Sequence, residues 1–200
     1  MDYPPYRQAV ASFIEVLEQV RPEQWDLPAL GEWNVRELAG HTARSLAAVI
    51  EFAATTAEEV AVDSPAAYYR AALAAPGINQ QVAERGHAAG AALGPDPLAV
   101  VRPAAERALA TLGSVPNDAR WTVNVGGMWA ADYMPSRVME LTIHTLDLAQ
   151  AIGYPVQPGR EALSVVLHLL AELALDSPQG GALALVATGR RVDAPFTVLG

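Results

Sequence analysis

Apolar residues recur three and four positions apart through most of this 200-residue chain, and Gly or Pro interrupts each run. This spacing lines apolar side chains along one face of an α-helix. Near the N-terminus, Val10, Phe13 and Leu17 form one such face. A chain of this length buries enough surface to fold without disulfides. The pattern therefore predicts a mainly all-α protein built as a helix bundle.

The ends of the helices are also marked in the sequence. Asn34 followed three residues later by Glu37 is typical of a capping box, and Ser64-Pro65 and Asp96-Pro97 are typical helix starts. We expect helices over residues 5–20, 35–56, 65–75, 78–93, 97–112, 135–152 and 159–175. Helical spacing is lost over 113–133, where WTVNV is compatible with a short strand.

The last residues change character. ALALVAT (182–188) and PFTVLG (195–200) are short apolar runs separated by polar residues, a pattern that predicts two strands of a β-hairpin. The predicted organisation is thus a helix bundle over residues 1–176, with a short β appendage over 177–200 packed on it.

Charge and cysteine content restrict the partners. The formal net charge is −9, and all 13 basic residues are Arg, which argues against nucleic acid or an anionic membrane surface. Without cysteine, any thiol used in a reaction must come from outside the chain. The N-terminus lacks the pattern of a signal peptide, and no apolar run reaches the ~20 residues that span a bilayer. We expect a cytoplasmic protein that acts on small molecules, and apolar helix faces make a homodimer the expected assembly.

Two short segments carry groups that can bind a metal. Glu140 and His144 are four residues apart, so both project from the same face of a helix. His41, from the helix after Asn34, would complete a His/Glu/His set. Such ligands suit Zn, Ni, Fe or Mn, and three protein ligands leave a position for water or substrate, as in catalytic sites. The alternative is that both imidazoles are ordinary buried histidines.

Other ionisable residues near these segments could belong to the metal site or have a purely structural role. Glu37 could be a fourth ligand, although its place in the capping box is the simpler interpretation. Asp147, one turn after His144, could hold the imidazole in the tautomer that binds metal, or could be solvated. We assign neither His87 nor His168 to the site.

The pattern WNVRELAGH, followed a hundred residues later by SRVMELTIHTLDLAQAIG, resembles the DinB-like superfamily. More closely, it resembles the mycothiol-dependent maleylpyruvate isomerase group. The resemblance implies a four-helix bundle that binds a divalent metal, usually zinc, through His41, Glu140 and His144, with mycothiol as thiol cofactor. The isomerase carries a sizeable C-terminal domain after the bundle, whereas residues 177–200 are short, so the maleylpyruvate reaction itself is not expected.

Further residues are candidates for the chemistry. Arg137 and Asp147 are the candidate catalytic residues, because Arg137 could bind a substrate carboxylate. Arg44, Trp129 and Tyr133 are the candidate cofactor-binding residues. Arg137 and Arg44 could instead form salt bridges within the bundle, and the segment GGMWAADYM could be a flexible rim or only turns.

Three functions fit these observations. The first is a metal-dependent enzyme that activates mycothiol for isomerisation or S-transfer on a small electrophile. The second is a metal-dependent hydrolase, lyase or cyclase of specialised metabolism that uses no thiol. The third is a non-catalytic bundle that binds a metal or small molecule.

Overall fold

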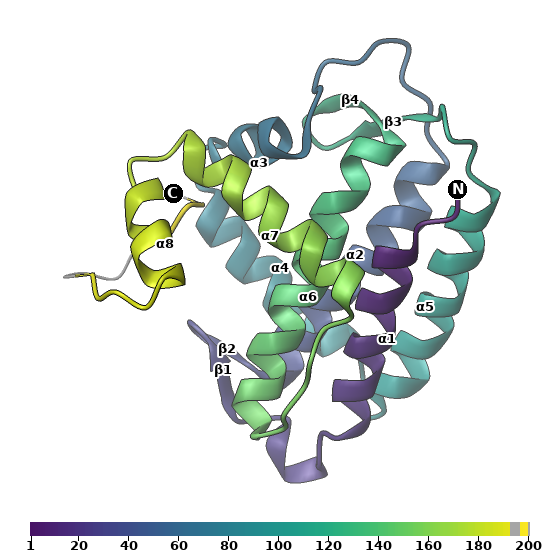
Figure 1. Cartoon of the computed structure of the whole chain (residues 1–200). Coiled ribbons are helices and arrows are strands. Elements are labelled where there is room, and N and C mark those ends of the chain that lie inside the picture. The colour runs from purple at the N-terminus through teal and green to yellow at the C-terminus, as the bar shows by residue number, and fades with distance from the viewer. Residues whose placement is uncertain (193–196, 200) are drawn as a thin grey trace.

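A computed structural model describes residues 1–192 and 197–199, and these residues are mainly α-helical (Figure 1). The helices are α1 (Pro4–Glu18), α2 (Val35–Ala53), α3 (Pro65–Leu73), α4 (Ile78–Ala92), α5 (Pro97–Ser114), α6 (Ala130–Ile152), α7 (Arg160–Leu175) and α8 (Gly180–Ala187). A short 3-10 helix covers Pro22–Gln24. The strands are β1 (Pro28–Leu30), β2 (Trp33–Asn34), β3 (Arg120–Val123) and β4 (Gly126–Trp129).

Four of the helices form a closed ring. Helix α6 packs on α1 and α2, and α5 packs on the same two helices from the opposite side. Helix α4 flanks α2, and α7 lies against α1 and α6 (Figure 1). The four-helix bundle that the family resemblance implies is therefore confirmed, with α4 and α7 as additional layers.

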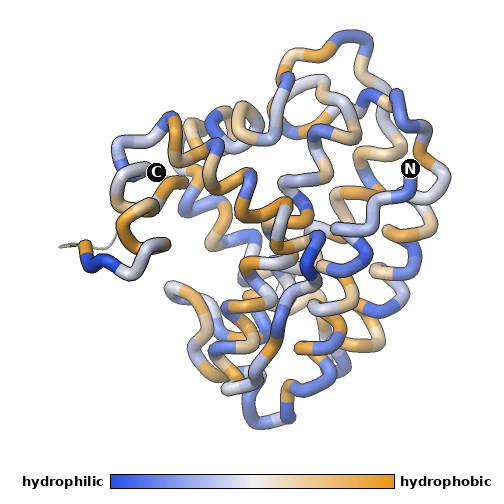
Figure 2. The backbone as a smooth tube through the Cα atoms, in the orientation of Figure 1, coloured by the Kyte–Doolittle hydropathy of each residue, from blue (hydrophilic) through white to orange (hydrophobic). Residues whose placement is uncertain are grey.

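The bundle core is apolar, as the spacing predicts. The ring helices carry hydrophobic and hydrophilic residues together along their length (Figure 2). Phe13, Leu38, Val101 and Leu141, one from each ring helix, are fully buried. Among the described residues, no helix combines the length and the apolar character needed to cross a bilayer.

The predicted helix start at Asn34 is confirmed in detail. The Asn34 side chain accepts a hydrogen bond from the Glu37 amide at 2.9 Å, and the Glu37 carboxylate accepts one from the Asn34 amide at 2.9 Å. This capping box fixes where α2 begins, and it therefore sets which residues of α2 face the bundle.

Two predictions about element type or boundaries are wrong. Residues 182–188, expected as a strand, lie mostly in α8, because Ala and Leu favour helix. The second expected strand, 195–200, falls partly outside the described residues. Helix α6 begins at Ala130 and not near Pro135, because the buried Tyr133 and Met134 anchor a turn of helix before the proline.

The segment GGMWAADYM is regular structure. Its first four residues are β4, which pairs antiparallel with β3, and the rest is the first turn of α6. A side chain at Gly127 would collide with the backbone of Glu59, so this glycine serves close packing and not a hinge. The predicted short strand at WTVNV corresponds to β3.

Candidate metal centre

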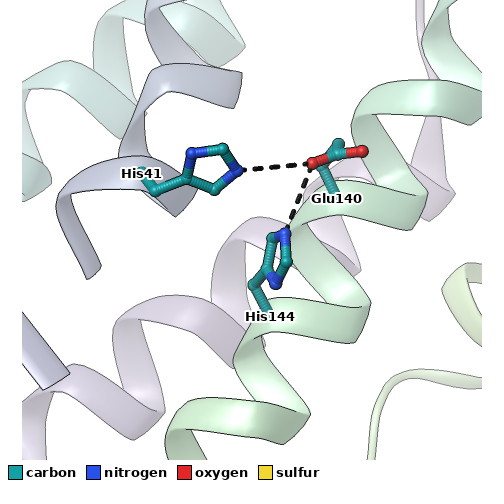
Figure 3. A group of neighbouring side chains, drawn as sticks. All are labelled: His41, Glu140 and His144. Atoms are coloured by element: carbon teal, nitrogen blue, oxygen red, sulfur yellow. Dashed lines mark ion pairs between the residues drawn. The ribbon is translucent and has the colours of Figure 1, made fainter. Parts of the chain in front are cut away.

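His41, Glu140 and His144 meet between α2 and α6 (Figure 3). Both imidazoles turn an Nε2 atom towards the same carboxylate oxygen, Oε2 of Glu140. The distances are 3.8 Å from His41 and 3.4 Å from His144. All three candidate ligand atoms lie within 4.8 Å of one another. The structure thus brings together the three residues that the sequence singles out.

The spacing of these atoms suits a small divalent cation. Zinc binds imidazole nitrogen and carboxylate oxygen at ~2.0–2.2 Å, so neighbouring ligands of a tetrahedral site are about 3.3 Å apart. The two distances to Glu140 are close to that value. The imidazole side chains are each 16% exposed and the carboxylate 23%, so the group is sheltered but reachable. The donor set therefore fits a cation with three protein ligands.

The two imidazoles are oriented by different contacts. Nδ1 of His144 lies 3.1 Å from Oδ2 of Asp147, which favours the tautomer whose Nε2 is free to bind metal. The ring of His41 packs against Trp33, with centroids 4.5 Å apart. Nδ1 of His41 is buried and makes no hydrogen bond to the described residues. Asp147 is thus in the position expected for a residue that supports a ligand.

The carboxylate between the imidazoles stays ionised. Burial alone would raise the pKa of Glu140, but the nearby imidazoles of His144 and His41 and the charge of Arg137 outweigh it and hold the pKa well below its usual range. Burial also disfavours charge on His144, yet Asp147 and Glu140 raise its pKa to about 9. A cation at this position would displace the proton of that imidazole and take over its role beside the carboxylate.

The second oxygen of Glu140 has its own partner. The hydroxyl of Tyr69, on α3, donates a hydrogen bond to Oε1 at 2.7 Å. The Tyr69 side chain is almost fully buried. No local pattern in the sequence shows that α3 lies over α6, so Tyr69 is not predictable from the sequence as a partner of Glu140.

A cavity of about 450 Å³ opens beside His41 and Glu140. Its walls come from α2, α3, α4, α6 and the turn between β3 and β4. Its polar lining residues, apart from the two ligands, are Arg44, Ser45, Tyr68, Tyr69, Gln81, Arg85, Asn124, Tyr133 and Arg137. Glu140 is the one acidic residue of this lining, against three arginines, so the cavity is cationic in a protein of net charge −9.

Arg137 is held by aromatic and hydroxyl groups. Its guanidinium carbon lies 4.8 Å from the centroid of the Tyr133 ring and 5.7 Å from that of Tyr68. It donates hydrogen bonds to the Ser136 hydroxyl at 3.1 Å and the Tyr68 hydroxyl at 3.3 Å. Arg137 makes no salt bridge with a described carboxylate within 4 Å. The alternative prediction, a salt bridge within the bundle, is therefore wrong for this residue.

Arg44 and Arg85 also reach the cavity, from α2 and α4. Both are exposed, and neither has a hydrogen bond or salt bridge to a described residue. Arg44 was a candidate from the sequence, whereas Arg85 was missed. Arg85 reaches the cavity only because α4 packs on α2. That packing depends on close contacts at glycines, which the local sequence around Arg85 does not show.

The remaining candidates lie elsewhere. Trp129, predicted to contact a cofactor, is 39% exposed on β4 beside Arg120 and is not among the residues that line the cavity. Glu37 bonds Asn34 and His87 and lies outside the ligand group. His168 is exposed on α7, with its Nδ1 2.7 Å from the Ser164 carbonyl.

The fold and the site together define a helix-bundle protein with a candidate His/Glu/His metal centre that opens to a cationic cavity. Comparison with protein families agrees with this class. The family described as mycothiol maleylpyruvate isomerase N-terminal domain matches residues 6–149, and the chain belongs to that family. The match includes all three candidate ligands. No curated protein and no solved structure matches the chain.

Proposed function

We propose that this protein is a divalent-metal-dependent enzyme that activates an external low-molecular-weight thiol, mycothiol, for isomerisation or S-transfer on a small electrophilic substrate. The observation that carries the proposal is the position of the ligand group: His41 and Glu140 form part of the wall of a cavity large enough for a small molecule. Family membership supports the choice of thiol.

The ligand set would hold the cation through the Nε2 atoms of His41 and His144 and one oxygen of Glu140. Bound there, zinc or a similar ion would supply Lewis acidity, which lowers the pKa of a coordinated thiol. The chain has no cysteine of its own, so this external thiol would be the nucleophile. A cytoplasmic location is part of this proposal.

The residues of the cavity have distinct roles in this proposal. Arg137, fixed by Tyr68 and Tyr133, would bind a carboxylate of the substrate or cofactor, because a guanidinium pairs with two oxygens at once. Arg44 would attract the same anionic ligand at the cavity mouth. Asp147 would keep His144 in the metal-binding tautomer. The apolar part of the lining would exclude water from the reacting atoms.

The proposal is tested by metal analysis followed by thermal unfolding. Protein purified without chelator should contain about one divalent ion per chain, and His144→Ala should contain none. Mycothiol should raise the unfolding temperature of the metal-loaded protein, since a ligand at 100 times its Kd stabilises the folded state by about 2.7 kcal/mol. An S-methylated mycothiol should stabilise it much less.

The control for this experiment is His168→Ala, which removes an exposed imidazole that is not part of the ligand group. It should keep both the metal and the response to mycothiol. Thiol activation would be contradicted if mycothiol and its S-methyl derivative stabilised the protein equally, or if neither of them stabilised it. Such a result in a metal-loaded protein would favour a hydrolase, lyase or cyclase that works without a thiol.

A further inference from the structure

The two oxygens of Glu140 face different partners. Oε2 faces both imidazoles, at 3.4 and 3.8 Å. Oε1 points to the other side and accepts the hydrogen bond of Tyr69 at 2.7 Å. Among the hydrogen bonds of the described residues, no other donor reaches Oε1. The carboxylate therefore enters the ligand group with one oxygen already engaged.

The hydroxyl of Tyr69 is fixed in this place by two helices. Tyr69 lies on α3, whose start is capped by Ser64 and whose first residue is Pro65. Its ring packs edge-on against Tyr68, with centroids 5.6 Å apart. The hydroxyl also lies 3.3 Å from the Ser136 carbonyl, one turn before Glu140 on α6. The Tyr69 hydroxyl is thus held against α6, the helix that carries two of the ligands.

From this geometry we propose that Tyr69 is a positioning residue that keeps Glu140 a one-oxygen ligand, and so preserves an open coordination position towards the cavity. The inference rests on the metal centre of the proposed function. A carboxylate that is free to rotate can bind a cation through both oxygens, which would use the position needed by thiol or substrate. The hydrogen bond to Oε1 opposes that rotation.

The expected loss of metal affinity can be taken from other residues that hydrogen-bond a metal ligand. Removing a group that hydrogen-bonds a ligand costs about 10–100-fold in metal affinity or activity. For Tyr69→Phe we expect affinity to fall by about tenfold, because a second oxygen from Glu140 recovers part of the loss. The same change should raise the coordination number of the bound ion.

The chain offers a closely matched control. Tyr68 is the neighbouring residue, is equally buried, and lines the same cavity, but its hydroxyl lies beside Arg137 and makes no hydrogen bond to Glu140. Tyr68→Phe therefore removes the same atom from the same helix without touching the carboxylate. Both variants keep the aromatic ring, and circular dichroism at 222 nm checks that both fold.

The experiment loads the wild type and both variants with Co²⁺, whose visible absorption is strong in four-coordinate sites and weak at higher coordination number. Affinity is measured by competition with a chromophoric chelator. Wild type and Tyr68→Phe should show the same strong bands and the same affinity. Tyr69→Phe should show weaker bands and an affinity about tenfold lower.

The outcomes separate this inference from the proposed function. If Tyr69→Phe keeps the wild-type spectrum, the role assigned to Tyr69 is wrong while the metal centre stands. If Tyr68→Phe changes the spectrum as much as Tyr69→Phe, the effect belongs to the cavity wall in general and the assignment is again overturned. If the wild type binds neither Co²⁺ nor Zn²⁺, the metal centre itself is wrong and the inference falls with it.

Discussion

Gly40 of α2 lies directly against the backbone of α4, and replacing it by Ala should separate the two helices. A Cβ at this position would lie 2.4 Å from the carbonyl carbon of Ala89 and from the nitrogen of Gly90. Ordinary contact begins near 3.4 Å. Since the obstructing atoms are backbone, no side chain can rotate away, and α4 must move by about 1 Å.

The cost of this movement can be bounded. Overpacking of this kind destabilises a protein by about 1–3 kcal/mol, and a backbone clash falls at the upper end of that range. Ala gains about 1 kcal/mol over Gly in helix propensity. The net loss is therefore about 2 kcal/mol, which lowers the unfolding temperature of a chain of this size by roughly 4–8 °C.

The same substitution at Gly113 provides the control. Gly113 is also helical, near the end of α5, and a Cβ there would meet nothing within 4 Å. Gly113→Ala should therefore keep or slightly raise the unfolding temperature. Thermal unfolding followed by circular dichroism measures both variants. If Gly40→Ala is as stable as Gly113→Ala, the close packing of α4 on α2 is not as described.

Further predictions concern the site and the docking of α4. His144→Ala should lose bound metal and activity together, while His168→Ala keeps both, as measured by elemental analysis and enzyme assay. Asp147→Asn should bind metal about tenfold more weakly, measured by chelator competition, and wild-type affinity in this variant would refute the role of the hydrogen bond. Hydrogen bonding to Glu37 is the main cause that raises the pKa of His87, so its contribution to stability is complete below pH 6.5 and is lost as the pH rises through the higher folded value. Urea unfolding from pH 5 to 9 should show a larger loss of stability in wild type than in His87→Gln, and identical profiles would contradict this role of His87.

The candidate ligands were predictable because their signals are local. Glu140 and His144 are one turn apart, and the capping box at Asn34 fixes the start of the helix that carries His41. The spacing of apolar residues shows which face of each helix is buried. A bundle core allows only a few arrangements of these buried faces. Helix geometry and the bundle fold make a meeting of the three groups possible, and the family resemblance is what singles it out over ordinary buried histidines.

The residues that were missed depend on contacts between distant segments. Tyr69 reaches Glu140 because α3 folds over α6, and Arg85 reaches the cavity because glycines let α4 approach α2. No sequence pattern near Tyr69 or Arg85 indicates that α3 packs on α6 or that α4 packs on α2. Trp129 shows the converse error, since an aromatic residue just before the ligand helix lies on a strand whose pairing directs it towards Arg120. The expected strand at 182–188 failed because a short apolar run fits helix and strand equally well.

The ligands of the candidate centre come from α2 and α6, which neighbour each other in the ring but are separated by nearly half of the chain. A cation bound there would cross-link the two helices in a protein that has no cysteine for a disulfide. Because an ion that binds only the folded state adds stability in proportion to the logarithm of its free concentration, the lifetime of the folded chain would follow the cell's supply of that metal. Starvation for the metal would then lower the fraction of the protein that is folded.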